Sequence, residues 1–377
     1  MARLRVGVVG AGFIGQEHLK AVGGHDGFEL VGLSEQSPAL AQARSEEFGV
    51  PAYEGHLALI KEARPDYIAI STPHYSHTQI AIDAMQRGVH ALVEKPLTVS
   101  AAAGELCLEV MERTGMTVGV GFVMRLHPLH RKMHELLAAG FVGDTVRVSF
   151  VRTNWFRSMA YYRSSPWRGT WEGEGGGVLV NQAPHDLDLI LWTAGCPSEV
   201  LVEMNTSGHD IEVEDDVCAL LKWPSGATGV FHVSTNEAPG RSFYEIAGTR
   251  GALLLEDGTL RATELSVDSR HFSETTQERM DPPPVAQVTS YQQPEDAEPF
   301  GKLHENFAAA LAGAAPLLCT LEEGLQEVRL ANAMLLSGLS RSWTPVPAEA
   351  GRFDEALECL IAGKSLEACK NRPDCRS

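Results

Sequence analysis

Short apolar runs alternate with helix-like patterns along the first third of the chain. Apolar, β-branched runs predict strands at residues 4–10, 28–35, 65–72, 89–96 and 116–123. Apolar residues at helical spacing predict helices at residues 13–22, 38–49, 77–88 and 101–115. Strands that alternate with helices at this spacing form a parallel, doubly wound sheet. We therefore expect an α/β domain at residues 1–122.

The periodicity changes after residue 122. A helix is expected at residues 129–140, and residues 144–156 alternate like a half-buried strand. Short strands within residues 215–235 and 241–263 are separated by Pro-Ser-Gly, Gly-Thr-Arg-Gly and Asp-Gly, which are hairpin signals. These signals indicate antiparallel pairing in a second domain, residues 123–377.

The C-terminal part of this second domain combines a polar stretch with helical patterns. Residues 264–300 are polar and contain several prolines, so we expect a long irregular connection at the surface. Residues 302–313 and 321–342 have helical patterns, and these helices could pack back onto the first domain.

Composition and charge exclude several classes of protein. The 377 residues are 44% hydrophobic and 21% charged, as in globular proteins. The net charge is −18 and no long basic run occurs, so we expect no nucleic-acid or anionic-membrane surface. No apolar run reaches the roughly 18 residues that span a bilayer, and a strand-like run begins directly at the N-terminus. These features predict a cytoplasmic protein.

The seven cysteines are scattered and form no Cys-x-x-Cys pair, so neither a zinc knuckle nor a disulfide framework is indicated. Cys359, Cys369 and Cys375 lie close together in the sequence, and in a reducing compartment we expect free thiols.

A glycine-rich motif joins the first predicted strand to the first helix. Gly10, Gly12 and Gly15 form Gly-x-Gly-x-x-Gly. In a Rossmann-type domain the first glycine allows a tight turn, the second lets a pyrophosphate approach, and the third lets the helix lie close to the strand. The helix N-terminus then faces the phosphates. The motif alone would also fit an ordinary glycine-rich turn.

An acidic residue strengthens the nucleotide-binding interpretation. Glu35 ends the second strand, twenty residues after Gly15, where an acid accepts the ribose hydroxyls. The following Gln36, Ser37 and Pro38 include no arginine for a 2′-phosphate. We therefore expect NAD rather than NADP.

Two other strand ends carry unusual residues. Thr72-Pro73 and Glu94-Lys95-Pro96 end predicted strands, and proline cannot continue a ladder. Lys95 is thus a candidate acid, base or alkoxide stabiliser, or simply a solvated lysine. The residues expected at the cofactor are Gly10, Gly12, Phe13, Ile14, Gly15, Glu35, Thr72, Pro73, His77, Glu94 and Lys95.

A histidine follows three glycines in the segment GGGVLVNQAPHDLDLILW, residues 175–192. Pro184 suits the first turn of a helix, which Asn181 or Gln182 could cap. The positive end of that helix disfavours a charged His185, which would stay neutral and able to accept a proton. The glycines would let the backbone approach a cofactor or sugar closely.

A metal site is not indicated. His130 and His134 are spaced to share a helix face, but no further residue is spaced to complete a ligand set. We therefore interpret His185 as a proton-transfer group, with helix capping alone as the alternative.

These motifs, in this order and spacing, resemble the Gfo/Idh/MocA oxidoreductases, named for glucose–fructose oxidoreductase and inositol dehydrogenase. The resemblance extends from residue 2 to about residue 250, and more loosely to about residue 355. It implies a C-terminal open, mostly antiparallel sheet with helices on one face. Its other face would form a homodimer or homotetramer contact. It also implies hydride transfer between a nicotinamide and a sugar or cyclitol carbon, with Lys95 and His185 at the reacting hydroxyl.

One position departs from the family pattern. Inositol dehydrogenase-like members have an aspartate four residues before this histidine, and this chain has Asn181. Asparagine can hold a hydroxyl or orient a ring, but it cannot stabilise imidazolium as a carboxylate does. This departure places an inositol substrate in doubt.

Aromatic residues and arginines precede the glycines, and they suit a polyhydroxylated ring. Trp167 and Arg168, with Arg125 by family position, are the predicted substrate contacts; half of the aromatic group could equally be core. The prediction is an NAD-dependent dehydrogenase of a sugar, glycoside or cyclitol. A redox-neutral glycoside-cleaving enzyme and a non-catalytic NAD-dependent regulator are the alternatives.

Overall fold

The computed structural model describes residues 3–293 and 298–363. The chain divides into two compact units. The first comprises the described residues of Met1–Leu126 and Ala297–Val328, and the second those of His127–Asp296 and Arg329–Ser377. The prediction of free thiols at Cys369 and Cys375 falls outside the described residues.

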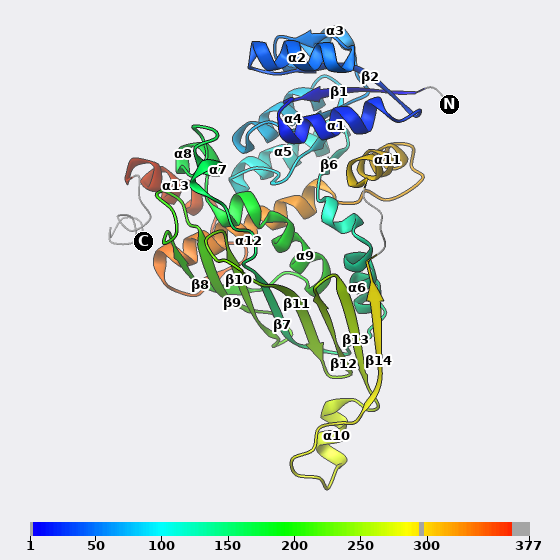
Figure 1. The fold of residues 1–377 in the computed structure, drawn as a ribbon, viewed down its shortest axis with the longest axis vertical. Coiled ribbons are helices and arrows are strands. Elements are labelled where there is room, and N and C mark those ends of the chain that lie inside the picture. The colour runs from blue at the N-terminus through cyan, green and yellow to red at the C-terminus, as the bar shows by residue number, and fades with distance from the viewer. Residues whose placement is uncertain (1–2, 294–297, 364–377) are drawn as a thin grey trace. The chain divides into compact units, whose positions relative to one another are not determined.

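The first unit is built on a six-stranded sheet in the order β3-β2-β1-β4-β5-β6, with every neighbouring pair parallel. Figure 1 labels β1, β2 and β6 of this sheet together with helices α1 to α5. This confirms the predicted doubly wound sheet. The strands are β1 (Leu4–Val9), β2 (Phe28–Ser34), β3 (Ala52–Tyr53), β4 (Tyr67–Ile70), β5 (His90–Val93) and β6 (Val118–Val120). The connecting helices are α1 (Phe13–Gly23), α2 (Pro38–Phe48), α3 (His56–Ala63), α4 (His77–Met85) and α5 (Ala101–Thr114).

The central strands of this sheet are buried on both faces, which is why their sequences are almost entirely apolar. The returning helix α11 (Pro299–Leu311) completes one side of the core. Its residues Leu303 and Phe307 pack in one cluster with Phe28 and Tyr67. The following helix, α12 (Leu321–Ser340), begins in the first unit and ends in the second.

The second unit is built on a nine-stranded sheet in the order β14-β13-β12-β11-β7-β10-β9-β8-β15. Only the neighbours β10 and β7 are parallel among its described pairs. This confirms the mostly antiparallel sheet. Its strands are β7 (Thr145–Arg152), β8 (Glu199–Asn205), β9 (Asp216–Lys222), β10 (Thr228–Ser234), β11 (Ser242–Gly248), β12 (Gly251–Glu256), β13 (Thr259–Leu265), β14 (Val285–Gln292) and β15 (Thr344–Pro345).

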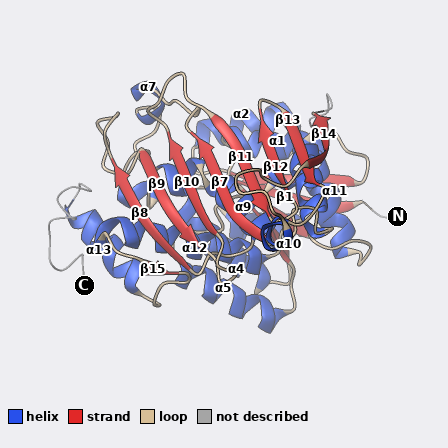
Figure 2. Ribbon diagram, turned by 90° about the horizontal axis from the view of Figure 1, so that it is seen from below, coloured by secondary structure: helices blue, strands red, loops and turns tan. Residues whose placement is uncertain are grey.

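Buried and exposed residues alternate along β8, β9 and β10, so this sheet has one packed and one exposed face. Figure 2 shows β8, β9, β10 and β7 side by side, with their near face uncovered. The helices of this unit are α6 (Pro128–Ala138), α7 (Met159–Tyr162), α8 (Trp171–Glu174), α9 (Pro184–Ala194), α10 (Ser269–Thr275) and α13 (Arg352–Gly363).

The expectation of an irregular connection at residues 264–300 is wrong. This stretch contains α10, which Asp268 caps by accepting hydrogen bonds from the N–H groups of Arg270 and His271. It also contains β14, which pairs along its length with β13. The strand is an exposed edge with polar residues on both faces, so it lacks the apolar alternation that identifies a strand from sequence.

Candidate functional site

The glycine turn between β1 and α1 has one position that is open and two that are closely packed. A Cβ on Gly10 would lie 2.6 Å from the Ser71 carbonyl oxygen, and Gly10 has a φ of +86°. A Cβ on Gly15 would lie 2.0 Å from the Gly10 carbonyl oxygen. A Cβ on Gly12 would meet no atom within 4 Å, and Gly12 begins α1 without a side-chain cap. The first turn of α1 therefore has the features of an anion site, and it fits a dinucleotide pyrophosphate.

Glu35 lies directly beside this turn. One carboxylate oxygen accepts a hydrogen bond from the Ala11 N–H at 2.8 Å, and the other accepts one from the Ser37 N–H at 3.0 Å. The Glu35 carboxylate is therefore held beside the glycine turn. A residue that binds the ribose hydroxyls is predicted at this place. The two backbone N–H groups leave it further acceptor capacity, since a carboxylate has about four lone-pair sites.

A basic residue that the sequence argument missed also lies at this turn. The Arg44 Nε donates to the Ala11 carbonyl oxygen at 3.3 Å, and its guanidinium pairs with Glu47 at 2.5 Å. The sequence argument considered only the three residues after Glu35. Arg44 comes from the middle of α2, and only the fold brings it to the loop.

The turns after β4 and β5 are tied together by His77. Its Nδ1 lies 2.8 Å from the Pro96 carbonyl oxygen and its Nε2 lies 2.7 Å from the Thr72 carbonyl oxygen. Burial lowers the pKa of His77. Both ring nitrogens thus face backbone atoms, and the structure gives His77 a role in holding the turns that carry Thr72 and Lys95. Its contact with a cofactor stays a prediction.

Lys95 is half-buried at the end of β5. Its backbone N–H donates to the Glu94 carboxylate at 3.2 Å, and the second Glu94 oxygen lies 3.1 Å from His18 Nε2. The Glu94 side chain is therefore folded back onto its own strand end and onto α1.

Arg125 is held inside the first unit. Its guanidinium is 3% exposed and donates to the Leu318 carbonyl oxygen at 3.0 Å and to Glu323 at 2.9 Å. These contacts anchor the segment that precedes α12. A contact between Arg125 and a substrate stays a prediction.

In the second unit, packing within the protein explains the glycines of residues 175–177. A Cβ on Gly177 would lie 1.9 Å from the Glu214 carbonyl oxygen. The buried Glu214 carboxylate accepts the N–H groups of Gly177 and Leu179, and burial raises its pKa to about 7. Gly175 ends α8 with a φ of +79°. These contacts account for the glycine run without a ligand.

Asn181 and Gln182 do not cap α9, and this prediction is wrong. They lie in a π-helical turn, Val178–Gln182, and Ala183 precedes the helix without a side-chain cap. The turn directs both amides to one neighbour, because each donates to the Tyr161 hydroxyl at 3.3 Å. Asn181 also donates to the buried Glu174.

His185 lies in the first turn of α9, directly after Pro184, as predicted. It is half-buried, and the next residue, Asp186, is fully buried. The Asp186 carboxylate pairs with the Arg152 guanidinium from β7 at 3.0 Å. This pair anchors the start of the helix that carries His185.

Arg168 lies between two aromatic rings. Its guanidinium carbon lies 4.4 Å from the ring centroids of both Tyr161 and Trp167, and it donates to the Tyr161 hydroxyl at 2.5 Å. Glu174 lies 3.8 Å from it. Tyr161, Arg168, Glu174, Asn181 and Gln182 therefore form one polar cluster. Sequence reasoning missed Glu174, which has no motif around it.

The two units thus carry different groups. The first holds the glycine turn, Glu35, the two strand-end turns and Lys95, and the second holds His185 and the polar cluster around Tyr161. Among residues 3–293 and 298–363, no three His, Cys, Asp or Glu side chains are arranged to share a metal ion. Within the same ranges no helix is both long and apolar enough to cross a bilayer.

Comparison with known proteins gives relatives of both units. The scyllo-inositol 2-dehydrogenase (NAD(+)) of Bacillus subtilis is 25% identical over 279 residues, which are 70% of this chain and 77% of that protein. The D-xylose 1-dehydrogenase (NADP(+)) 2 of Haloferax volcanii is 27% identical over 251 residues, 66% of this chain and 74% of that protein.

A solved structure with the same fold is the WlbA dehydrogenase from Bordetella pertussis in complex with NADH and UDP-GlcNAcA. It has a TM-score of 0.78 at 25% identity and covers 92% of this chain and 100% of its own.

Family models match both parts of the chain. Residues 4–122 match the model described as an oxidoreductase family with an NAD-binding Rossmann fold, and residues 130–254 match the GFO/IDH/MocA C-terminal domain. The chain therefore belongs to the Gfo/Idh/MocA family of oxidoreductases.

Proposed function

We propose that this protein is an NAD-dependent dehydrogenase that acts on a secondary hydroxyl of a sugar, glycoside or cyclitol. One observation carries the proposal: the uncapped first turn of α1 at Gly12 lies beside a carboxylate, Glu35, that is fixed by backbone N–H groups. This arrangement suits a pyrophosphate and a ribose diol. The sugar and inositol dehydrogenases among its relatives support the substrate class.

The proposed chemistry divides between Lys95 and His185. In the oxidative direction His185 takes the proton of the substrate hydroxyl. The Lys95 ammonium stabilises the negative charge that develops on that oxygen. NAD, when bound, supplies the acceptor for the hydride. Asn181 contributes by holding a hydroxyl, because an amide both donates and accepts.

Substrate recognition is proposed for the polar cluster in the second unit. Trp167 and Tyr161 offer aromatic faces, and Arg168 is held between them by its contacts with both rings. Aromatic faces suit the C–H surface of a sugar ring, while the guanidinium donates to ring hydroxyls.

The experiment that tests this function is absorbance at the reduced-nicotinamide band while a panel of sugars and cyclitols is added to protein and NAD⁺. Net NADH formation is expected with at least one member of the panel. Product without net NADH would instead support a redox-neutral glycoside-cleaving enzyme. Tight NAD binding with no product from any member would support a regulator.

The preference for NAD over NADP is assigned to Glu35. We expect Glu35→Ser combined with Gln36→Arg to shift the ratio of NAD to NADP affinities towards NADP by roughly tenfold or more, or about 1.4 kcal/mol. The change removes a charge that repels the 2′-phosphate and adds one that attracts it. Dissociation constants from fluorescence titration measure the ratio.

Glu35→Gln is the matched control, since it removes the charge but keeps an oxygen that can accept the Ala11 N–H. Its glycine turn should remain intact. An unchanged affinity ratio in the double variant would show that Glu35 does not reach the ribose.

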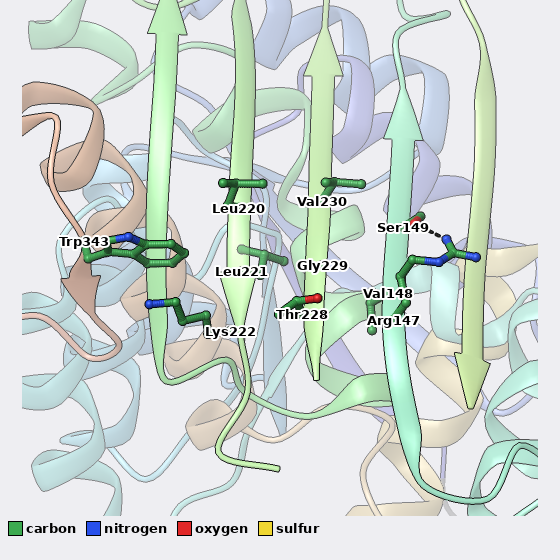
Figure 3. Close-up of a pocket in the computed structure, with 10 residues that line it drawn as sticks. All are labelled: Arg147, Val148, Ser149, Leu220, Leu221, Lys222, Thr228, Gly229, Val230 and Trp343. Atoms are coloured by element: carbon green, nitrogen blue, oxygen red, sulfur yellow. Dashed lines mark hydrogen bonds between the residues drawn. The ribbon is translucent and has the colours of Figure 1, made fainter. Parts of the chain in front are cut away.

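We also propose that the exposed face of the second sheet binds a second copy of the chain. This face carries the exposed apolar residues Val146, Leu220 and Val230. A hollow of about 250 Å³ lies there, and Leu220, Val230 and Trp343 are among the residues that line it. Figure 3 shows these side chains. Exposed apolar patches of this kind mark association surfaces.

Leu220→Lys with Val230→Lys is expected to convert the protein to a monomer, because two charges would be buried without partners at the contact. Light scattering after size-exclusion chromatography gives the mass. Leu106→Lys is the control, since Leu106 is equally exposed but lies on α5 in the other unit. A parent protein that is already monomeric would overturn the proposal.

A further inference from the structure

A chain of four buried polar side chains runs through the first unit and ends at the residue before Lys95. The Tyr67 hydroxyl lies 2.8 Å from His304 Nδ1, and His304 Nε2 lies 2.9 Å from His18 Nδ1. His18 Nε2 lies 3.1 Å from a Glu94 carboxylate oxygen. The other Glu94 oxygen accepts the Lys95 N–H at 3.2 Å. Four separate elements supply these groups: β4, α11, α1 and the end of β5.

The chain is enclosed by apolar and aromatic surroundings. Tyr67 and His304 are fully buried, and His18 is 1% exposed. The His304 ring packs edge-on against His18, with ring centroids 5.1 Å apart. A Cβ on Gly121 would lie 2.8 Å from the Glu94 carboxylate, so the absence of a side chain there makes room for it. Buried polar groups at this depth are costly unless each donor has an acceptor.

The hydrogen positions follow from that requirement. Burial raises the pKa of Tyr67 and holds the pKa of His304 well below its ordinary value, so the phenol is protonated and the imidazole neutral. If Tyr67 donates to His304 Nδ1, the single His304 hydrogen is on Nε2 and donates to His18. His18 then carries its hydrogen on Nε2 and donates to Glu94. Every donor meets an acceptor, and the chain ends on an ionised carboxylate.

The opposite direction of hydrogen-bond donation, from Glu94 towards Tyr67, is less favourable. It needs a protonated Glu94 that donates to His18, which in turn donates to His304. His304 then donates to the Tyr67 oxygen, and the Tyr67 hydrogen loses the acceptor that His304 provides. The Lys95 N–H also favours the ionised form, since it donates to the carboxylate.

An ionised Glu94 has a direct consequence for its neighbour. A fixed negative charge one residue away favours the ammonium form of Lys95 over the amine. His77 is another titratable group beside this turn, and burial lowers its pKa.

We propose that Tyr67, His304 and His18 are positioning residues that hold Glu94 ionised, and that Glu94 in turn keeps Lys95 as an ammonium ion. The inference rests on the proposed function, since it assigns Lys95 to charge stabilisation and leaves proton transfer to His185. The three positioning residues act only through Glu94.

The hydrogen order is tested without any activity. In protein labelled with ¹⁵N-histidine, two-bond proton–nitrogen spectra distinguish the two neutral tautomers and the imidazolium. His18 and His304 are expected to be neutral Nε2–H tautomers. The variants His18→Gln and His304→Gln assign the signals. An Nδ1–H tautomer or a titrating imidazolium at either position would overturn the hydrogen order, whether or not the protein is a dehydrogenase.

The effect on Lys95 is tested by the pH dependence of kcat/KM. In Glu94→Gln the alkaline limb should move to lower pH by about one unit, because the ammonium loses its negative partner. In His18→Leu it should move in the same direction by less, because the carboxylate keeps its charge but loses the donor that holds it in place. His18→Gln keeps an N–H group that can donate to Glu94, so its alkaline limb should lie at the same pH as that of the parent protein. The control His56→Leu removes another histidine–carboxylate pair of the first unit, with Asp83, and should leave the limb in place.

A limb that stays in place in both Glu94→Gln and His18→Leu would overturn the proposal even if turnover fell, since a purely structural role lowers turnover without moving the limb. Absence of NADH formation by the parent protein would instead refute the proposed function, and the NMR result would still decide the hydrogen order.

Discussion

Replacing His185 with alanine should lower turnover by roughly 10²–10⁴-fold, the usual contribution of a lost general base. The inflection of the rate near about pH 6–7, where an imidazole titrates, should disappear with it. NAD affinity should survive, because α9 and the glycine turn belong to different units. Steady-state kinetics across pH and a separate NAD titration measure the two effects.

Lys95→Ala is the companion variant. It should also lower turnover, but the inflection near pH 6–7 should remain because His185 still titrates. If Lys95→Ala removed the inflection and His185→Ala left it intact, Lys95 would be the base. The roles proposed for the two residues would then be reversed.

Gly15→Ala is expected to destabilise the first unit by about 3 kcal/mol or more, at the upper end of the cost of overpacking. The added Cβ would lie 2.0 Å from the Gly10 carbonyl oxygen, and a backbone atom cannot rotate away as a side chain can. Thermal unfolding of the variant should show a lower midpoint. NAD should not bind measurably, because α1 has to move away from the turn.

Gly12→Ala separates folding from binding. Its Cβ would meet no atom within 4 Å, so the thermal midpoint should remain near that of the parent protein. Its methyl group would occupy the open space at the first turn of α1, and NAD affinity should fall by about tenfold or more. Equal NAD affinity in Gly12→Ala and the parent would show that the pyrophosphate does not approach this glycine.

The first unit was largely predictable because its signals are local. Buried parallel strands are continuous apolar runs, and the glycine motif lies between a strand and a helix that each have a clear pattern. Helix α3 and the two-residue strand β3 were missed. β3 is too short to show a periodic pattern, and α3 follows Gly55, which provides no side-chain cap.

The candidate site was predictable only where a motif carries the chemistry. Glu35 follows from its distance to Gly15, and His185 follows from its position after Pro184. The contacts among His18, His304 and Tyr67 join residues up to 286 positions apart, and no local pattern relates them. Glu174 was missed for the same reason, since only the π-helical turn directs Asn181 towards it.

Helix α11 belongs to the first unit but comes late in the sequence, so the core of that unit is completed late in synthesis. Leu303 and Phe307 complete its core, and His304 supplies the hydrogen-bonding partner of the Tyr67 hydroxyl. A ribosome that has released only residues 1–122 has therefore made the whole six-stranded sheet but left one side of it open to water. Strands β7 to β14 of the second sheet also emerge before α11 can close that side. Exposed apolar surface of this kind promotes aggregation in unfinished chains. A fragment cut at residue 122 should therefore be less soluble than the complete chain, even though it contains every residue of the glycine motif.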